Sequence, residues 1–342
     1  MSPVQYPAEL QLKFRNQLTN RRARLKKTIA DLNQPPDLLL WLHDVDAALS
    51  QLDGATYGEC QVCHLEIAAD DLLANPTASY CLCELTPERQ RALERDLTLA
   101  WPVQAALVPP PDLAVPAWQT HYRYIPHGPV SGEHCDLVRE CHPAAEFYFM
   151  LGHVSGKGVA VSLLMAHRNA SLRAFLRAGL PPEEALAEAN RVLAWSTLAS
   201  PSRTLVCGRA NASGEVEIAN AGHCPPFVVR SNGRVETLPT TGLPLGLAVP
   251  TPDGARYATE KVWLGDADSI VLYTDGVTEA TNTHDEEFGA GRLRSLLACC
   301  AGLPARDLVT RCLADLTSFL EGEALSDDLM ILALGRCRRE AS

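Results

Sequence analysis

The sequence predicts an α/β domain that follows a smaller helical module carrying a cysteine cluster. Three observations support this division. Residues 1–53 show apolar side chains at helical spacing, residues 54–85 hold closely spaced cysteines, and residues 112–342 alternate short apolar runs with helical segments. The remaining residues, 86–111, are rich in proline toward their end and are predicted to connect the two regions.

Residues 1–53 are predicted to form a helical hairpin. Apolar residues recur at helical spacing in residues 8–32 and in residues 37–52, and Asn33–Pro36 separates the two helices. Helices joined by so short a segment usually pack antiparallel. The stretch Lys13–Lys27 is basic and contains no acidic residue, and we expect it to form a solvated helix face.

Residues 54–85 are predicted to hold a structural zinc site. Cys60 and Cys63 form a C-x2-C pair, a spacing with which two thiolates bind Zn²⁺. The predicted ligands are Cys60, Cys63, Cys81 and Cys83. Glu84 is an alternative fourth ligand and His64 a less favoured one, and a segment that packs without metal is the other interpretation.

The cysteine segment and the helices before it resemble the DksA/TraR zinc-finger family over about residues 8–100. The resemblance is carried by Tyr57–Cys63 and by Tyr80–Pro87. It implies an alternative function, action on RNA polymerase. That function is disfavoured because the hairpin tip of the family is acidic, whereas here it reads Asn33–Asp37.

Residues 86–111 are predicted to be a connecting helix followed by a stiff linker. Thr86 suits the N-cap and Pro87 the first helical position, while Pro109–Pro111 ends the segment and marks the expected domain boundary. Connecting helices of this kind often pair between subunits, so a homodimer is expected.

The composition excludes several classes of protein. Apolar residues make up 46% and charged residues 21% of the 342, which is ordinary for a globular protein. The net charge of −11 disfavours nucleic-acid binding. There is no apolar run long enough to span a membrane and no secretion signal, so the 12 cysteines are expected to be reduced in a cytoplasmic protein.

Polar residues that could bind metal recur at turns in residues 112–342. Glu133 precedes a strand, His153 lies near the end of the apolar strand 147–154, Asp275 follows the apolar strand 270–274, and Asp327-Asp328 precede the last strand. Carboxylates that converge from distant strand ends suit a pair of hard cations that activate water for phosphoester hydrolysis.

In this order the segments resemble the PPM-type metal-dependent serine/threonine phosphatases of the SpoIIE-like and RsbU-like branch. The resemblance covers Trp118–Arg338 and is supported by Asn220–Pro226, Gly242–Gly246 and Glu287–Gly289. It implies a sandwich of two antiparallel sheets flanked by helices, with a two-metal centre of Mn²⁺ or Mg²⁺. It also implies a metal-activated water in place of a nucleophilic side chain.

The resemblance assigns the metal centre to specific positions. These are Glu133, Gly152, His153, Asp275, and Asp327 or Asp328. Gly152 is expected to be a point of close backbone approach. Glu133 and His153 stand where the family has aspartates, and a neutral imidazole cannot bridge two cations as a carboxylate does. We therefore expect a weakened centre or a preference for a softer metal.

The resemblance implies a phosphatase of a partner-switching pathway that controls sigma factors. Its substrate would be a phosphorylated regulatory protein such as an anti-sigma-factor antagonist. Two alternatives remain open: a pseudophosphatase or binding module with an impaired metal centre, and a sandwich in which the acidic residues only cap turns. His223, between glycine and prolines, is expected to hold its loop by hydrogen bonds.

Overall fold

The computed structural model describes twelve ranges of the chain. They are residues 6–31, 36–54, 56–60, 65–79, 99–100, 102–128, 130–139, 147–154, 159–194, 203–246, 257–325 and 327–337. The chain divides into two compact units, Met1–Arg95 and Asp96–Ser342, and each is described by itself.

The first unit contains the predicted helical hairpin. Its helices are α1 (Ala8–Asp31), α2 (Pro36–Asp53) and α3 (Ala69–Ala74). Arg15 lies 2.8 Å from Asp53 and Arg22 lies 2.6 Å from Asp46, so α1 and α2 run antiparallel. The basic stretch on α1 is thus partly neutralised by α2, although ion pairs this exposed add little stability.

The core of the first unit extends from the hairpin to the cysteine segment. Phe14 of α1 is fully buried and packs edge-on against Tyr6, whose hydroxyl donates to the Ile67 carbonyl at 2.5 Å. Cys60 is buried in the same cluster, and its N–H donates to the Leu65 carbonyl at 2.9 Å. The other predicted zinc ligands, Cys63, Cys81 and Cys83, lie outside the described residues, as do His64, Glu84 and the predicted helix start at Thr86.

The second unit is built on two antiparallel sheets. The six-stranded sheet has the order β1-β2-β11-β10-β7-β8, with β1 (Asp112–Val115), β2 (Trp118–Ile125), β7 (Phe227–Val229), β8 (Val235–Thr237), β10 (Ser269–Tyr273) and β11 (Leu329–Arg336). The five-stranded sheet has the order β3-β4-β5-β6-β9, with β3 (His134–Arg139), β4 (Phe147–Val154), β5 (Arg203–Ala210), β6 (Glu215–Ala221) and β9 (Glu260–Trp263).

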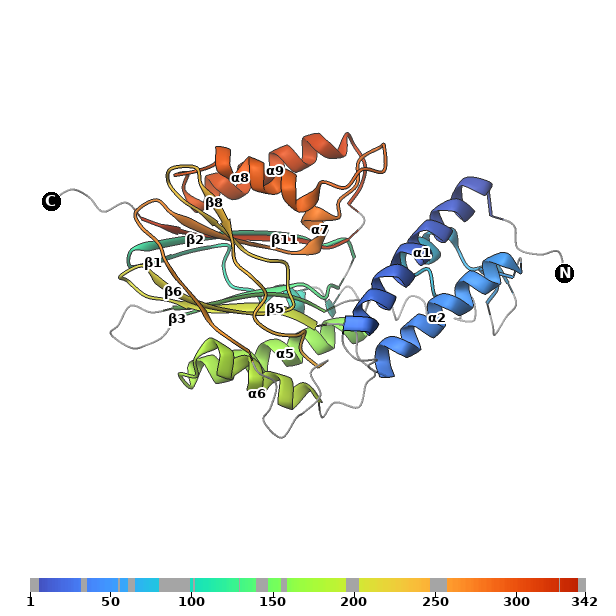
Figure 1. Cartoon of the computed structure of the whole chain (residues 1–342), viewed down its shortest axis with the longest axis horizontal. Coiled ribbons are helices and arrows are strands. Elements are labelled where there is room, and N and C mark those ends of the chain that lie inside the picture. The colour runs from blue at the N-terminus through green and yellow to red at the C-terminus, as the bar shows by residue number, and fades with distance from the viewer. Residues whose placement is uncertain are drawn as a thin grey trace. The chain divides into compact units, whose positions relative to one another are not determined.

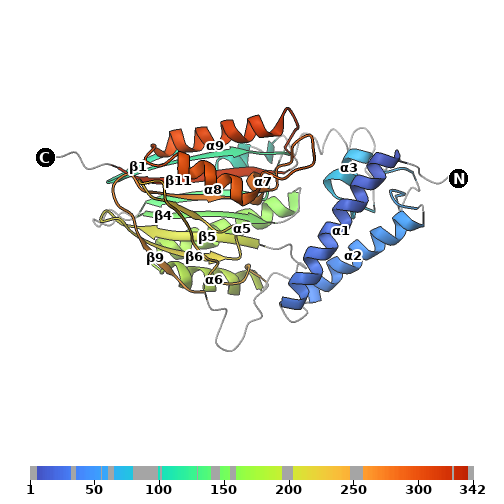
Figure 2. The same ribbon diagram turned by 45° about the horizontal axis from the view of Figure 1, so that its top comes forward.

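Helices cover the outer face of each sheet, which gives four layers (Figure 1 and Figure 2). Two pack on the six-stranded sheet, α8 (Gly289–Cys299) and α9 (Ala305–Leu320), and two on the five-stranded sheet, α5 (Val159–Arg177) and α6 (Pro182–Ala194). This arrangement confirms the predicted α/β sandwich of two antiparallel sheets.

The apolar runs in the sequence follow from this layering. Side chains of a strand alternate between its two faces. In β4, Phe149 and Leu151 point into the core between the sheets, while Tyr148 and Met150 pack under α5 and α6. A strand buried on both faces needs apolar residues at successive positions, which is why residues 147–154 read as a continuous apolar run.

The segment before β1 belongs to the second unit. Gln104 accepts a hydrogen bond from the Ser131 N–H at 3.0 Å and donates one to the Ser131 carbonyl at 2.5 Å. The Tyr122 hydroxyl donates to the Pro109 carbonyl at 2.6 Å. The expected boundary at Pro109–Pro111 therefore lies inside the second unit, whose first residue is Asp96.

Candidate metal centre

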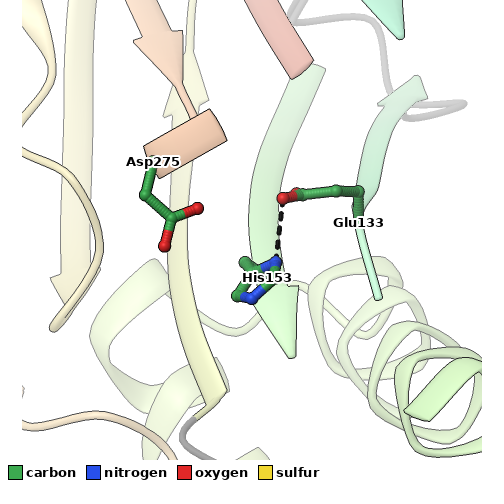
Figure 3. A group of neighbouring side chains, drawn as sticks. All are labelled: Glu133, His153 and Asp275. Carbon is green, nitrogen blue, oxygen red and sulfur yellow. Dashed lines mark hydrogen bonds and ion pairs between the residues drawn. The ribbon is translucent and has the colours of Figure 1, made fainter. Parts of the chain in front are cut away.

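Glu133 and His153 face each other across the β3–β4 pair. In this antiparallel pair His134 is opposite Gly152, and the Val154 N–H donates to the Gly132 carbonyl at 3.1 Å. The register thus places Glu133 opposite His153. Their side chains meet, with 2.8 Å between Nδ1 of His153 and Oε1 of Glu133 (Figure 3).

Asp275 reaches the same place from the other sheet. It follows β10 and begins the short helix α7 (Asp275–Thr278). One donor atom each from Glu133, His153 and Asp275 lies within 4.8 Å of the others. Figure 3 shows the Asp275 carboxylate and the His153 ring turned toward each other. Three predicted positions far apart in the sequence therefore form one cluster, the donor cluster, where strands of the two sheets end.

The turn that carries Asp275 requires a glycine after it. A Cβ built on Gly276 would lie 2.0 Å from the Asp328 carbonyl oxygen. No side chain fits such a gap, so this close contact ties the start of α7 to the residues that enter β11. The sequence motif Asp275-Gly276 therefore reflects packing of two backbone segments beside the donor cluster.

Gly152 also lies at a point of close packing. It pairs with His134 on one side and Leu205 on the other, and a Cβ there would lie 2.5 Å from the Leu205 side chain and 3.1 Å from the Arg168 guanidinium. Arg168, a fully buried residue of α5, donates to the His153 carbonyl at 3.1 Å. The glycine leaves room for this arginine, which holds the backbone of His153.

Asp327 and Asp328 lie near the donor cluster without joining it. Oδ1 of Asp328 accepts the His127 N–H at 2.7 Å, and Oδ1 of Asp327 accepts the Asp328 N–H at 2.9 Å. The negative charge of Asp328 adds to the raised pKa of Glu133, and that of Asp327 adds to the raised pKa of His153. Both aspartates thus contribute negative electrostatic potential at the site.

Burial and pairing shift the pKa values of the two facing residues. Burial raises the pKa of the Glu133 carboxyl to about 7, although the His153 charge and hydrogen bond act against this rise. Burial alone would lower the pKa of His153, but the charge and hydrogen bond of Glu133 outweigh burial and raise it to about 9. The contact thus opposes burial at both residues, because it favours the ionised carboxylate of Glu133 and the protonated ring of His153.

A polar row continues from His153 into the five-stranded sheet. His153 pairs with Thr204 of β5, and the Thr204 hydroxyl lies 2.8 Å from Nδ1 of the buried His223. Asn220 accepts the His223 N–H at 2.7 Å and donates to its carbonyl at 3.1 Å. Burial and, to a smaller extent, the nearby charges of His153 and Arg168 lower the pKa of His223 to about 3. His223 thus holds its turn as a neutral residue.

Two cysteines near the donor cluster are poor nucleophiles. Burial and, to a smaller extent, the charges of Asp275 and Glu133 raise the pKa of the Cys224 thiol to about 12. Burial likewise holds the pKa of Cys135 well above its usual range. A thiol must ionise to attack phosphorus, so neither residue suits covalent catalysis at neutral pH.

The donor set fits one divalent cation. Two carboxylates and an imidazole can neutralise and coordinate a single ion. The structure also holds a buried oxygen that a cation would satisfy: Oε2 of Glu133 has no hydrogen-bond partner among the described residues. The set differs from an all-carboxylate centre, in which a carboxylate can lie between two ions.

The fold and this site define a class, the PPM-type phosphatase domains, which are also called PP2C-like. The SiaA-PP2C domain of Pseudomonas aeruginosa matches with a TM-score of 0.59 at 18% identity, covering 73% of this chain and 98% of that domain. The RsbU and RsbW domains of Rv1364c from Mycobacterium tuberculosis match with a TM-score of 0.55 at 26% identity, covering 68% of this chain and 63% of that one.

The sequence itself places the chain in a family. Residues 143–336 match the family described as Stage II sporulation protein E (SpoIIE), and because the match spans more than half of the chain, the chain belongs to the SpoIIE family. The matched range includes His153, Asp275, Asp327 and Asp328, and Glu133 lies before it.

Two curated relatives match parts of the chain in sequence. Protein IcfG of Synechocystis is 24% identical over 258 residues, which are 66% of this chain and 39% of IcfG. Phosphoserine phosphatase RsbU of Bacillus subtilis is 27% identical over 157 residues, 45% of each chain. The chain thus matches less than half the length of either relative.

No helix in the described part of the chain is both long and apolar enough to cross a membrane.

Sequence reasoning did not single out Arg168 or Thr204. Arg168 lies in a helix between polar neighbours, His167 and Asn169, where a surface position is the usual expectation. Its burial depends on the carbonyls of His153 and Thr204, which accept its hydrogen bonds from adjacent strands. Only the strand pairing brings these acceptors together, so no local pattern could have indicated them.

Proposed function

We propose that the chain is a metal-dependent protein serine/threonine phosphatase of a partner-switching pathway. The observation that carries this proposal is the convergence of Glu133, His153 and Asp275 within 4.8 Å of one another. Membership in the SpoIIE family supports it, as does the similarity to RsbU, a phosphoserine phosphatase. The proposed substrate is a phosphoserine or phosphothreonine on a regulatory protein such as an anti-sigma-factor antagonist.

In the proposed mechanism the donor cluster would hold the metal, and Asp327 and Asp328 add negative charge nearby. A bound divalent cation would polarise the phosphoryl oxygens and make a water molecule easier to ionise. Glu133 orients the His153 ring through the 2.8 Å contact, and Arg168 fixes the His153 backbone. The Gly152 backbone is a further proposed contributor to metal binding.

The proposal is tested by assaying the purified chain against p-nitrophenyl phosphate and a phosphoserine-bearing antagonist protein. Each assay is run with Mn²⁺, with Mg²⁺ and after removal of divalent cations by a chelator. We expect hydrolysis that needs a divalent cation and returns when the cation is restored. Hydrolysis that survives chelation would exclude the metal-dependent mechanism.

A pseudophosphatase is the second candidate, and the His153–Glu133 pair favours it. A protonated His153 ring would bring positive charge to the site without a metal ion. In that case the chain would bind a phosphorylated partner without hydrolysing it. Stable binding of the phosphoprotein by a chain that shows no turnover in any tested cation would support this candidate over the enzyme.

For the first unit we propose a structural zinc site at Cys60, Cys63 and Cys81, with Cys83 or Glu84 as fourth ligand. Two hydrogen bonds support it: Cys60 N–H to the Leu65 carbonyl at 2.9 Å, and Ile67 N–H to the Gly58 carbonyl at 2.8 Å. These draw residues 58–60 against residues 65–67, on either side of the C-x2-C motif. About one zinc per chain is expected, and Cys60→Ser should release it.

A homodimer through residues 86–107 is likewise a proposal, tested by light scattering.

A further inference from the structure

We infer that the donor cluster binds a single transition-metal cation, such as Mn²⁺, Fe²⁺ or Co²⁺, in preference to a pair of Mg²⁺ ions. This inference rests on the proposed function in placing a metal at Glu133, His153 and Asp275. It goes further by fixing the number and the chemical class of the ion.

One oxygen of the cluster is buried and without a partner. The Glu133 side chain is 0% exposed, and its Oε2 makes no hydrogen bond to any described residue. A carboxylate oxygen that is buried without a partner raises the free energy of the folded chain, and a bound cation offsets most of this increase. Oε1 is already engaged by Nδ1 of His153, so Oε2 and the second ring nitrogen of His153 remain for an ion.

The donors suffice for one ion and not for two. The two carboxylates of the cluster carry charge that balances one divalent cation. A second cation a few ångströms away would repel the first strongly, and an imidazole between them would offset none of that repulsion. Asp327 and Asp328 do not belong to the group of donor atoms that lie within 4.8 Å of one another, and Oδ1 of each already accepts a backbone N–H.

The imidazole decides the class of ion. Mg²⁺ prefers oxygen ligands in strict octahedral geometry and gives up its waters reluctantly. An imidazole with carboxylates suits Mn²⁺, Fe²⁺, Co²⁺ or Zn²⁺, whose affinities exceed that of Mg²⁺ at nitrogen-containing sites. The His153 ring is also held as a metal-binding histidine usually is, because one ring nitrogen contacts a carboxylate.

The inference is tested by counting bound ions on the full chain without substrate. Mn²⁺ is titrated into chelator-treated protein, and free Mn²⁺ is followed by electron paramagnetic resonance. Mn²⁺ is chosen because cysteine thiolates bind softer ions in preference, so the cysteines of the chain should add little to the number of Mn²⁺ ions counted. We expect about one tightly bound Mn²⁺ per chain, which a tenfold excess of Mg²⁺ does not displace.

Variants assign the ion to the cluster. His153→Ala should weaken Mn²⁺ binding by at least about tenfold, and His153→Asn serves as the second variant if the alanine form does not fold. His167→Ala, the same change at an exposed histidine of α5, is the matched control and should bind Mn²⁺ like the wild type. His153→Asp should admit Mg²⁺ more readily than the wild type.

Two equally tight Mn²⁺ ions per chain, ready displacement by Mg²⁺, or unchanged binding in the folded His153 variants would each overturn the inference. These results are distinct from failure of the proposed function. If the chain binds one Mn²⁺ at His153 but hydrolyses no phosphoprotein, the inference stands and the proposed phosphatase function is wrong. If the chain hydrolyses phosphoserine with two Mg²⁺ ions, the proposed function stands and the inference is wrong.

Discussion

Nδ1 of His153 in β4 lies 2.8 Å from Oε1 of Glu133, the residue just before the neighbouring antiparallel strand β3. The contact depends on register. A shift of one residue in β3 would turn Glu133 to the other face of the sheet, away from His153. The pairing of His134 with Gly152 is therefore as important to this site as the identity of the two side chains.

Asp275→Asn should abolish metal-dependent hydrolysis while leaving the fold intact. The change keeps the size of the side chain and removes the charge that holds a cation, so we expect the rate in Mn²⁺ to fall by at least about 100-fold. Stability should be unchanged or slightly higher, because the Asp275 charge adds to the raised pKa of Glu133. The rate is measured with a phosphoserine protein, and stability by urea unfolding.

Asp285→Asn is the matched control for that experiment. Asp285 is exposed and lies in a turn with a positive φ of 58°, which asparagine also tolerates. This variant should hydrolyse the substrate at the wild-type rate. Equal activity of the Asp275 and Asp285 variants would show that Asp275 holds no essential ion.

Gly276→Ala should destabilise the second unit. The added methyl group would lie 2.0 Å from the Asp328 carbonyl oxygen, so one of two backbone segments has to move. We expect a loss of about 1–3 kcal/mol in the free energy of unfolding. Gly291→Ala is the control, because that position in α8 is open, and alanine there should add up to about 1 kcal/mol. Equal effects of the two changes would contradict the close contact.

Stability should fall as the pH drops below about 6.5, the usual pKa of histidine. His223 has a folded-state pKa of about 3, below its value in the unfolded chain, so its contribution is complete above pH 6.5 and is lost progressively toward pH 3. At pH 5 the loss from this residue amounts to about 2 kcal/mol. The buried His134, with its pKa lowered to about 3 by burial and the Arg168 charge, acts in the same direction.

Urea unfolding of the wild type and His223→Gln between pH 7.5 and 5 measures this effect. Glutamine does not titrate and can still hydrogen-bond the Thr204 hydroxyl, so the variant should lose less stability than the wild type on acidification. The difference between the two slopes isolates His223 from every other titrating group. Parallel slopes would mean that His223 is not held neutral by its surroundings.

Arg173→Gln should weaken the attachment of α5 to β3. Arg173 makes two hydrogen bonds to the buried Asp136, at 2.6 and 2.7 Å, and its removal leaves an unpaired carboxylate inside the protein. We expect a loss of about 2 kcal/mol, less than for a fully buried pair because the Arg173 side chain is 40% exposed.

Arg173→Lys should recover part of that loss, since lysine restores the charge without the paired geometry of the guanidinium. Arg177→Gln, at an exposed position at the end of the same helix, should change stability by no more than about 0.5 kcal/mol. Thermal unfolding ranks the three variants. A lysine variant no better than glutamine would assign the whole effect to geometry.

The sequence predicted the elements whose residues are buried on two faces. The apolar run at residues 147–154 became β4, and the run at residues 270–274 became β10. The short edge strands β8 and β9 were not predicted, because few of their residues are buried and their sequences show little pattern. Helix α9 was also missed, although Leu308 and Leu316 mark its buried face.

The candidate site was accessible to sequence reasoning only in part. Glu133 and Asp275 lie beside a strand and a turn, and the family resemblance assigned these two residues and His153 to the metal centre. The residues that hold the site in place, Arg168 and Thr204, could not be named. Arg168 hydrogen-bonds backbone carbonyls, which every residue has, and Thr204 contacts His223 through its hydroxyl. Such contacts are set by which strands pair, and that is a property of the whole sheet.

The two hydrogen bonds between Gln104 and Ser131 have a consequence for how the site could be disturbed from a distance. The Ser131 hydroxyl in turn accepts the Glu133 N–H at 2.9 Å. Gln104 lies close to the start of the second unit, so tension along the chain at that point would pull on the loop before β3. Glu133 is thus mechanically linked, through one amide side chain and one hydroxyl, to the place where the polypeptide enters its second unit.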